Sequence, residues 1–264
     1  MVIPYARQSI SQQDINAVAE VLQSDYLTQG PVVPAFEDAV AELVGAKYAV
    51  AGNSATSMLH VACLALGVTA GDRVWTAPNS FVASANCALY CGAEVDFVDI
   101  DSETFNMSPT ALAVKLEQAS KSNTLPKVII AVHMGGQSCD MQSIGKMAKQ
   151  YGIKVIEDAS HAIGGSYNSQ KIGNCAHSDI TIFSFHPVKI ITSGEGGMAT
   201  TQDESLAHNM RMLRSHGITR DESEFEFTSD GPWYYEQQQL GLNYRLTDIA
   251  AALGLSQLQR IDSF

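Results

Sequence analysis

The chain has 264 residues, of which 45% are hydrophobic and 17% charged, the composition of a globular protein with ample apolar surface to bury rather than of a disordered one. Its formal net charge of −12, with no cluster of basic residues, argues against nucleic acid or an anionic membrane as a partner. An anionic ligand would need local help, such as backbone amides at a helix N-terminus.

The pattern of cysteines and the lack of long apolar segments favour a cytoplasmic location. Cysteine occurs five times, an odd number without C-x-x-C spacing, which favours reduced and buried thiols in a cytoplasmic protein (Cys63, Cys87, Cys91, Cys139 and Cys175). The N-terminus lacks a signal-peptide core, and no apolar run is long enough to span a bilayer. We therefore expect a soluble, cytoplasmic protein with no membrane partner.

In chain order, residues 1–30 form an N-terminal segment that contains an amphipathic helix over 11–23 and a turn-rich connector over 26–31. From about residue 47, short apolar strands alternate with helical patterns. The predicted strands are 48–51, 73–77, 94–99, 127–132, 154–157, 179–183 and 198–201. The predicted helices are 54–66, one opening at Ser108-Pro109, 140–151, 203–216 and 245–261.

This alternation predicts an α/β fold with a mostly parallel sheet flanked by helices, and we assign residues 31–264 to one large domain. The last helix is followed directly by the chain end at Phe264, without a closing turn or final strand. We expect a fragment of a longer protein whose C-terminal portion is absent.

The most informative segment is residues 184–197 (SFHPVKIITSGEGG), which places Lys189 among apolar neighbours and before a glycine-rich turn. A lysine in a loop is usually solvated. A lysine withheld from water can instead lose its proton and become a nucleophile. Ser184, at the end of the preceding strand, is placed to meet a phosphate.

Three further elements follow predicted strands. Asp158 lies at the end of strand 154–157, where ligands bind in open α/β sheets, although it could equally cap the following turn. Residues 52–56 (GNSAT) have the composition of a phosphate cradle at a helix N-terminus, although an ordinary N-cap looks the same. Phe81 could stack on a planar cofactor, or pack in the core as most phenylalanines do.

Together these groups match the requirements of pyridoxal phosphate, which needs a Schiff-base lysine, a partner for its ring nitrogen, a phosphate anchor and a stacking surface. The same residues resemble those of the DegT/DnrJ/StrS sugar aminotransferases, a family of fold-type I pyridoxal-phosphate enzymes. The resemblance runs along nearly the whole chain, through residues 26–31, 53–57, 157–164, 184–197, 214–217 and 241–248. Within the family, the sequence motifs most closely resemble those of the aminotransferases of pseudaminic-acid biosynthesis.

The resemblance implies a role for each matching residue. Lys189 would bind the cofactor covalently and later move the proton, and Asp158 would pair with the ring nitrogen. His161 would contact the ring's phenolate oxygen, and Phe81 would cover the ring face.

The phosphate contacts implied by the resemblance come from Ala55, Thr56 and Ser184, together with Asn243 from a partner subunit. That last assignment implies a homodimer with shared active sites, whereas on local sequence alone Asn243 could cap the helix that follows. The chain departs from the usual family sequence at two positions. Ile190 stands where proline is frequent, and Glu157 stands where another polar residue can occur.

The resemblance further implies amino transfer, with L-glutamate as donor, to C4 of a UDP-linked 4-keto-6-deoxy-N-acetylhexosamine. One alternative is a sugar 3-dehydratase of the same group, in which histidine typically replaces the lysine, so the retained Lys189 argues against it. The other is a non-catalytic cofactor-binding or regulatory fragment, since the small C-terminal domain of relatives is missing from the expected fold. Four residues are possible substrate contacts with equally possible structural roles (Tyr5, Arg7, Tyr26 and Arg220).

Other catalytic classes lack their motifs. The sequence contains no G-x-x-x-x-G-K-[ST] loop, G-x-S-x-G elbow or H-E-x-x-H pair. His133, His161, His177 and His186 belong to different predicted elements, so we expect no metal site.

Overall fold

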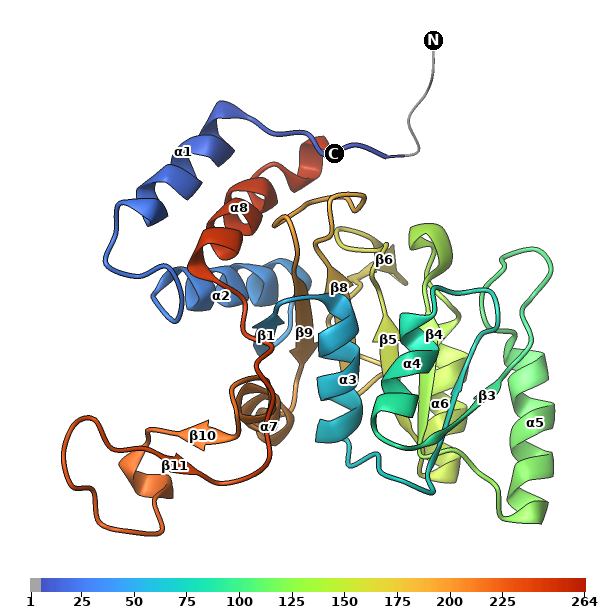
Figure 1. Cartoon of the computed structure of the whole chain (residues 1–264). Helices are drawn as coiled ribbons and strands as arrows, with labels where there is room; N and C mark the ends of the chain where they lie inside the picture. Colours follow the sequence, from blue (N-terminus) through green and yellow to red (C-terminus); the bar gives the residue numbers. More distant parts are fainter. Residues whose placement is uncertain (1–5) are drawn as a thin grey trace.

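A computed structural model describes residues 6–264 and contains a seven-stranded sheet in the order β1-β9-β8-β5-β4-β2-β3 (Figure 1). Strand β9 pairs antiparallel with both β1 and β8, and the remaining pairs are parallel. The predicted mostly parallel sheet is therefore confirmed, with each strand within a few residues of its expected range. The strands are β1 (Tyr48–Gly52), β2 (Arg73–Thr76), β3 (Glu94–Phe97), β4 (Val128–Val132), β5 (Lys154–Asp158), β8 (Ile180–Ser184) and β9 (Gly197–Thr201).

Eight α-helices accompany the sheet in the part of the chain that is described. Six of them begin at a side chain that caps the first turn, which is the local signal that the sequence offers; these N-caps are Ser11, Ser54, Ser108, Asp140, Asp203 and Thr247. The helices are α1 (Gln12–Leu22), α2 (Val32–Val44), α3 (Ala55–Ala65), α4 (Ala83–Tyr90), α5 (Pro109–Ser122), α6 (Met141–Tyr151), α7 (Glu204–Arg214) and α8 (Asp248–Leu258).

Alternation along the strands separates two apolar layers. Val50, Ile156 and Ile182 point to the face covered by α3, α4 and α7. Residues next to them in the strands, such as Ala49 and Phe183, point to the opposite face, which is covered by α2 and α8 at one end and by α5 and α6 at the other. Asp158 is two residues after Ile156, so its side chain lies on the face of α3 and α4.

The first and last helices lie side by side at one end of the sheet (Figure 1). The buried Asp248, at the start of α8, accepts hydrogen bonds from the backbone amides of Gly30, Val32 and Val33. This carboxylate therefore caps the N-terminus of α2 from a distant part of the sequence. The boundary that we place between residues 30 and 31 stays a prediction.

Shorter elements complete the described chain. Two two-stranded ribbons are formed by β6 (Ser166–Tyr167) with β7 (Gln170–Lys171), and by β10 (Ile218–Thr219) with β11 (Glu236–Gln237). The second ribbon and its long loop extend away from the sheet beside α7 (Figure 1). Single 3-10 turns are η1 (Met134–Gly136), η2 (Glu222–Glu224) and η3 (Ile261–Ser263). In residues 6–264 no helix is both long and apolar enough to cross a membrane.

Candidate active site

The predicted groups converge on one cavity of about 950 Å³, which opens where β5 and β8 end and α3 begins. Seven of the eight residues predicted to hold the cofactor line it: Ala55, Thr56, Phe81, Asp158, His161, Ser184 and Lys189. Asn243 is not among its lining residues. Parallel strands bring these side chains together because their carboxyl ends lie at one edge of the sheet.

Asp158 is the last residue of β5, and its carboxylate is held by two serines. Ser84 Oγ, on α4, lies 2.6 Å from Asp158 Oδ2, and Ser160 Oγ lies 2.6 Å from Oδ1. The Ser160 backbone amide also donates to Oδ1 at 3.2 Å, so the turn-capping role considered from sequence coexists with the cavity-lining one. Ser84 was absent from the sequence expectations.

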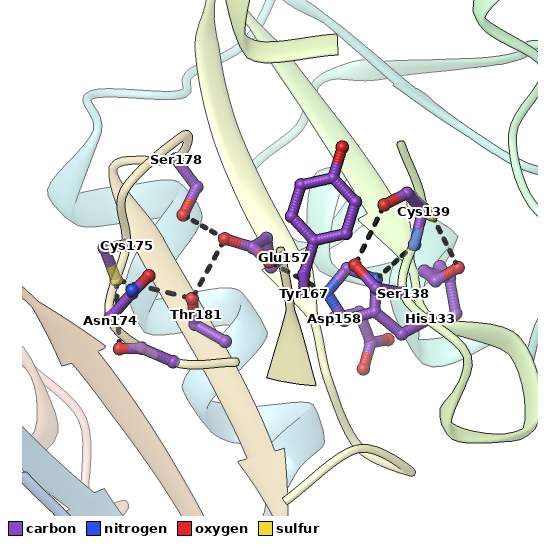
Figure 2. Close-up of polar contacts among 12 residues, drawn as sticks. His133, Ser138, Cys139, Glu157, Asp158, Tyr167, Asn174, Cys175, Ser178 and Thr181 are labelled. Atoms are coloured by element: carbon purple, nitrogen blue, oxygen red, sulfur yellow. Dashed lines mark hydrogen bonds and ion pairs between the residues drawn. The ribbon is translucent and has the colours of Figure 1, made fainter. Parts of the chain in front are cut away.

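Glu157, the neighbour of Asp158, points to the opposite side of β5 into a buried polar network (Figure 2). Its carboxylate accepts hydrogen bonds from Ser178, from Thr181 and, at 2.8 Å, from Nε2 of the buried His133. Since the Cys139 backbone amide donates to His133 Nδ1, the imidazole proton lies on Nε2. Burial raises the pKa of Glu157, but the hydrogen bond from His133 and those from the two hydroxyls outweigh it and lower the pKa overall.

His133 also fixes the backbone of Asp158. Its amide nitrogen donates to the Asp158 carbonyl oxygen at 3.0 Å, while its ring binds the side chain of Glu157. The end of β5 is thus held through its main chain on one side and through Ser84 and Ser160 on the other.

Lys189 is half-buried in the loop after β8, where its backbone amide closes a turn onto the His186 carbonyl at 2.9 Å. Burial lowers the pKa of Lys189 from its ordinary value, and the negative charge of Asp158 opposes this effect. Burial also lowers the pKa of His161, with a further contribution from the positive charge of Lys189. Both changes favour neutral, proton-accepting nitrogens in the cavity.

The N-terminus of α3 offers a cradle for an anion. Ser54 caps the helix by accepting from the Ser57 amide at 3.1 Å, and the Met58 amide donates to the Ser54 carbonyl. The amides of Ala55 and Thr56 come before these in the first turn and have no acceptor within the helix. They can therefore serve a phosphate, beside the hydroxyl of Ser184.

Gly197 allows this cradle to form. A Cβ atom built on Gly197 would lie 2.5 Å from the Ala55 nitrogen and 2.5 Å from the Ser54 carbonyl oxygen. Only a residue without a side chain lets β9 pass this close to the first turn of α3. The sequence pattern indicated close backbone approach in this glycine-rich segment without identifying its partner.

Phe81 and Asn243 lie at the solvent side. The Phe81 side chain is 74% exposed, so it lines the cavity without being part of the core. Asn243 is exposed and pairs with Ser215 in an isolated bridge outside α8, whose N-cap is Thr247. The helix-capping alternative for Asn243 is therefore not the arrangement observed.

Three of the possible substrate contacts, Arg7, Tyr26 and Arg220, do not line this cavity, and Tyr5 lies outside the described residues. Within residues 6–264 no group of three histidine, cysteine or acidic side chains has a geometry suited to a metal ion.

The donor set fits pyridoxal phosphate. An amide cradle suits a phosphate, a buried carboxylate suits a protonated ring nitrogen, and a half-buried lysine suits a covalent bond to an aldehyde. The collision that any Cβ at Gly197 would cause shows that the backbone is packed to keep the cradle in place. The fold and the site are those of a pyridoxal-phosphate-binding domain.

Comparisons with known proteins give the family. A family description, "DegT/DnrJ/EryC1/StrS aminotransferase family", matches residues 8–264, and the chain belongs to this family, which is pyridoxal-phosphate dependent. The resemblance drawn from the motifs is thereby confirmed.

Among curated relatives, the spore coat polysaccharide biosynthesis protein SpsC of Bacillus subtilis is 43% identical over 260 residues, covering 98% of this chain and 64% of SpsC. A UDP-4-amino-4,6-dideoxy-N-acetyl-beta-L-altrosamine transaminase of Campylobacter jejuni is 42% identical over 260 residues, covering 98% and 65%. The chain thus spans about two thirds of the length of these relatives.

The solved structures that match this chain are also aminotransferases. Helicobacter pylori PseC, an aminotransferase involved in the biosynthesis of pseudoaminic acid, matches with a TM-score of 0.89 and 33% identity, covering all of this chain and 67% of PseC. Spr1654 of Streptococcus pneumoniae matches in a PLP-form with a TM-score of 0.85 and 28% identity, covering 100% of this chain and 68% of Spr1654.

Proposed function

We propose that this chain forms the cofactor-binding part of an aminotransferase that uses pyridoxal phosphate to place an amino group on a nucleotide-linked keto sugar. The observation that carries the proposal is the convergence of Lys189, Asp158 and the free amides of α3 on one cavity. Family membership independently supports the same reaction class.

The residues would hold the cofactor by complementary chemistry. The amides of Ala55 and Thr56 and the hydroxyl of Ser184 would bind the phosphate, because a helix N-terminus favours negative charge. The carboxylate of Asp158 would accept the proton of the ring nitrogen. His161 would contact the ring oxygen, and Phe81 would cover one face of the ring.

When bound, pyridoxal phosphate would supply an aldehyde that condenses with amines and a ring that withdraws electrons from the substrate carbon. Lys189 would provide the neutral Nζ that attaches the cofactor and then removes and returns a proton at the substrate carbon. Its lowered pKa supports this role, because a larger fraction of the amine is neutral at a given pH. Asp158 would keep a negative charge next to the ring nitrogen throughout.

For the substrate, we propose a UDP-linked 4-keto-6-deoxy-N-acetylhexosamine that receives the amine at C4 from L-glutamate, in pseudaminic-acid biosynthesis in the bacterial cytoplasm. The names of the C. jejuni and H. pylori relatives support this choice. We further propose a homodimer in which Asn243 reaches the cavity of the partner subunit. Its exposed position outside its own cavity is consistent with such a role.

Adding pyridoxal phosphate to the purified protein should produce a visible absorption band, and Lys189→Ala should abolish the band. Lys47→Ala, which changes an exposed lysine on the loop before β1, is the control and should leave the band intact. A wild-type protein that stays colourless with added cofactor would refute the proposal.

The reaction itself can be tested with glutamate and a panel of nucleotide-linked 4-keto sugars, followed by mass spectrometry of the product. A gain of an amine supports the aminotransferase. Loss of water would instead indicate the dehydratase of the same family.

A further inference from the structure

Ser84 is a buried serine whose hydroxyl contacts the carboxylate of Asp158 from outside the cavity. It lies in the first turn of α4, is 1% exposed, and is absent from the residues that line the cavity. Its Oγ is 2.6 Å from Asp158 Oδ2. An ionised carboxylate can only accept, so the single hydroxyl hydrogen of Ser84 must be donated to Asp158.

This assignment fixes the direction of a short hydrogen-bond chain. Ser80 Oγ lies 3.3 Å from Ser84 Oγ, and Ser84 has no second hydrogen to give. Ser80 therefore donates to Ser84, and Ser84 donates to Asp158. Ser80 itself lines the cavity, so the chain runs from the cavity wall through the buried serine to the carboxylate.

The two oxygens of Asp158 are held by different parts of the fold. Oδ2 is bound by Ser84 of α4, and Oδ1 is bound by the hydroxyl and amide of Ser160 in the turn after β5. One contact alone would leave the carboxyl group free to rotate, whereas two contacts on opposite oxygens fix its plane.

We propose that Ser84 is a positioning residue for the cofactor: together with Ser160 it fixes the Asp158 carboxylate in one orientation for the ring nitrogen of pyridoxal phosphate. The inference rests on the proposed function and adds a residue to it. Ser84 belongs to the segment that also carries Phe81, so one short stretch of chain would set both the ring face and the partner of the ring nitrogen.

The chain offers a matched control. Ser256 Oγ, 5% exposed, also lies 2.6 Å from a buried aspartate oxygen, Oδ1 of Asp14, at the contact between α1 and α8. Ser256→Ala removes an equivalent hydrogen bond far from the cavity. Both variants should therefore lose stability, and only a positioning role should change the interaction with the ring nitrogen.

The experiment measures dissociation constants of the cofactor-free protein by absorbance or fluorescence titration, with pyridoxal phosphate and with an analogue in which carbon replaces the ring nitrogen. In Ser84→Ala the dissociation constant of pyridoxal phosphate should rise about ten-fold, the size expected for one lost hydrogen bond to a charged group. The dissociation constant of the analogue should not change. Ser256→Ala should change neither constant. Ser84→Thr, which keeps the hydroxyl, should restore part of the affinity.

Equal changes for the two ligands in Ser84→Ala, or no change for either, would overturn the positioning role while leaving the proposed function intact. If Ser84→Ala does not fold, Ser160→Ala gives the same comparison on the other oxygen, with the same criterion. A wild-type protein that binds neither ligand would refute the proposed function itself.

Discussion

Lys189 and Asp158 line the same cavity, and the negative charge of the carboxylate opposes the effect of burial on the amine. The amine is thus subject to two opposed influences, of which burial is the larger. The protonation of Lys189 therefore depends on the charge of Asp158, the residue that would hold the ring nitrogen.

Removing the charge of Asp158 should therefore make Lys189 a stronger nucleophile at low pH. In Asp158→Asn the effect that raises the pKa of Lys189 is lost, so the pKa should fall further. Labelling of Lys189 by an amine-reactive reagent, followed by mass spectrometry across pH, should show its midpoint displaced to lower pH. Lys47, on the surface, provides the internal control, and a midpoint displaced upward would contradict the prediction.

The buried Glu157 should contribute to stability through its charge. Glu157→Gln places an amide where His133, Ser178 and Thr181 donate, so at least one donor faces another donor. We expect a loss of about 2 kcal/mol in the free energy of unfolding, measured with urea at neutral pH. Glu117→Gln, at an exposed pair with Lys121, is the control and should have no measurable effect.

The pH dependence of this loss has a defined sign. The pKa of Glu157 is lowered in the folded protein, so its contribution is complete above the unfolded pKa and disappears as the pH falls through the folded one. The difference between wild type and Glu157→Gln should shrink in acid. A difference that grows on acidification would show that the carboxyl is protonated in the native state.

Gly197→Ala should damage the anion cradle. The new Cβ would meet the backbone of Ser54 and Ala55 at 2.5 Å, and overpacking of this kind costs about 1–3 kcal/mol. The affinity for inorganic phosphate and for pyridoxal phosphate should both fall about ten-fold, as isothermal titration can measure. Gly152→Ala, at the end of α6, adds a Cβ in open space at a residue with a positive φ of 69°; it disturbs the backbone away from the cavity and should leave both affinities unchanged.

Cys91 should be the most reactive of the five thiols. A hydrogen bond from Cys63 and the neighbouring His60 lower its pKa to about 5, and it is half-buried while the other four cysteines are fully buried. Iodoacetamide at neutral pH should label Cys91 first, and Cys91→Ser should remove the fast phase. Equal labelling rates for Cys91 and the buried cysteines would contradict this expectation.

Local patterns predicted most of the fold, and the exceptions have a physical cause. Helix α2 begins at Val32, and its N-cap residue Pro31 makes no side-chain cap; Asp248, from a distant part of the sequence, caps the helix instead. Helix α4 likewise lacks a side-chain cap, and its small residues face buried surroundings without a clear polar side. Neither helix was predicted from the sequence, because no capping side chain at its N-terminus marks where it begins.

The same distinction applies to the site. The positions of Lys189, Asp158 and the cradle at residues 52–56 could be predicted from the sequence, because each follows a strand or precedes a helix. Ser84 and Gly197 act on residues far along the chain, Asp158 and Ala55 respectively, and only tertiary structure brings them together. The role of Asn243 in a partner's cavity stays a prediction.

The capping of α2 by Asp248 also bears on how the protein is made. Helices α1 and α2 are synthesised before α8, yet α2 receives its cap, and α1 its main packing partner, only when α8 emerges. Strand β1 similarly has to wait for β9, its only neighbour in the sheet as described. The N-terminal part of the nascent chain should therefore remain accessible to chaperones until residue 248 has been synthesised, and this order makes folding dependent on contacts of long sequence separation.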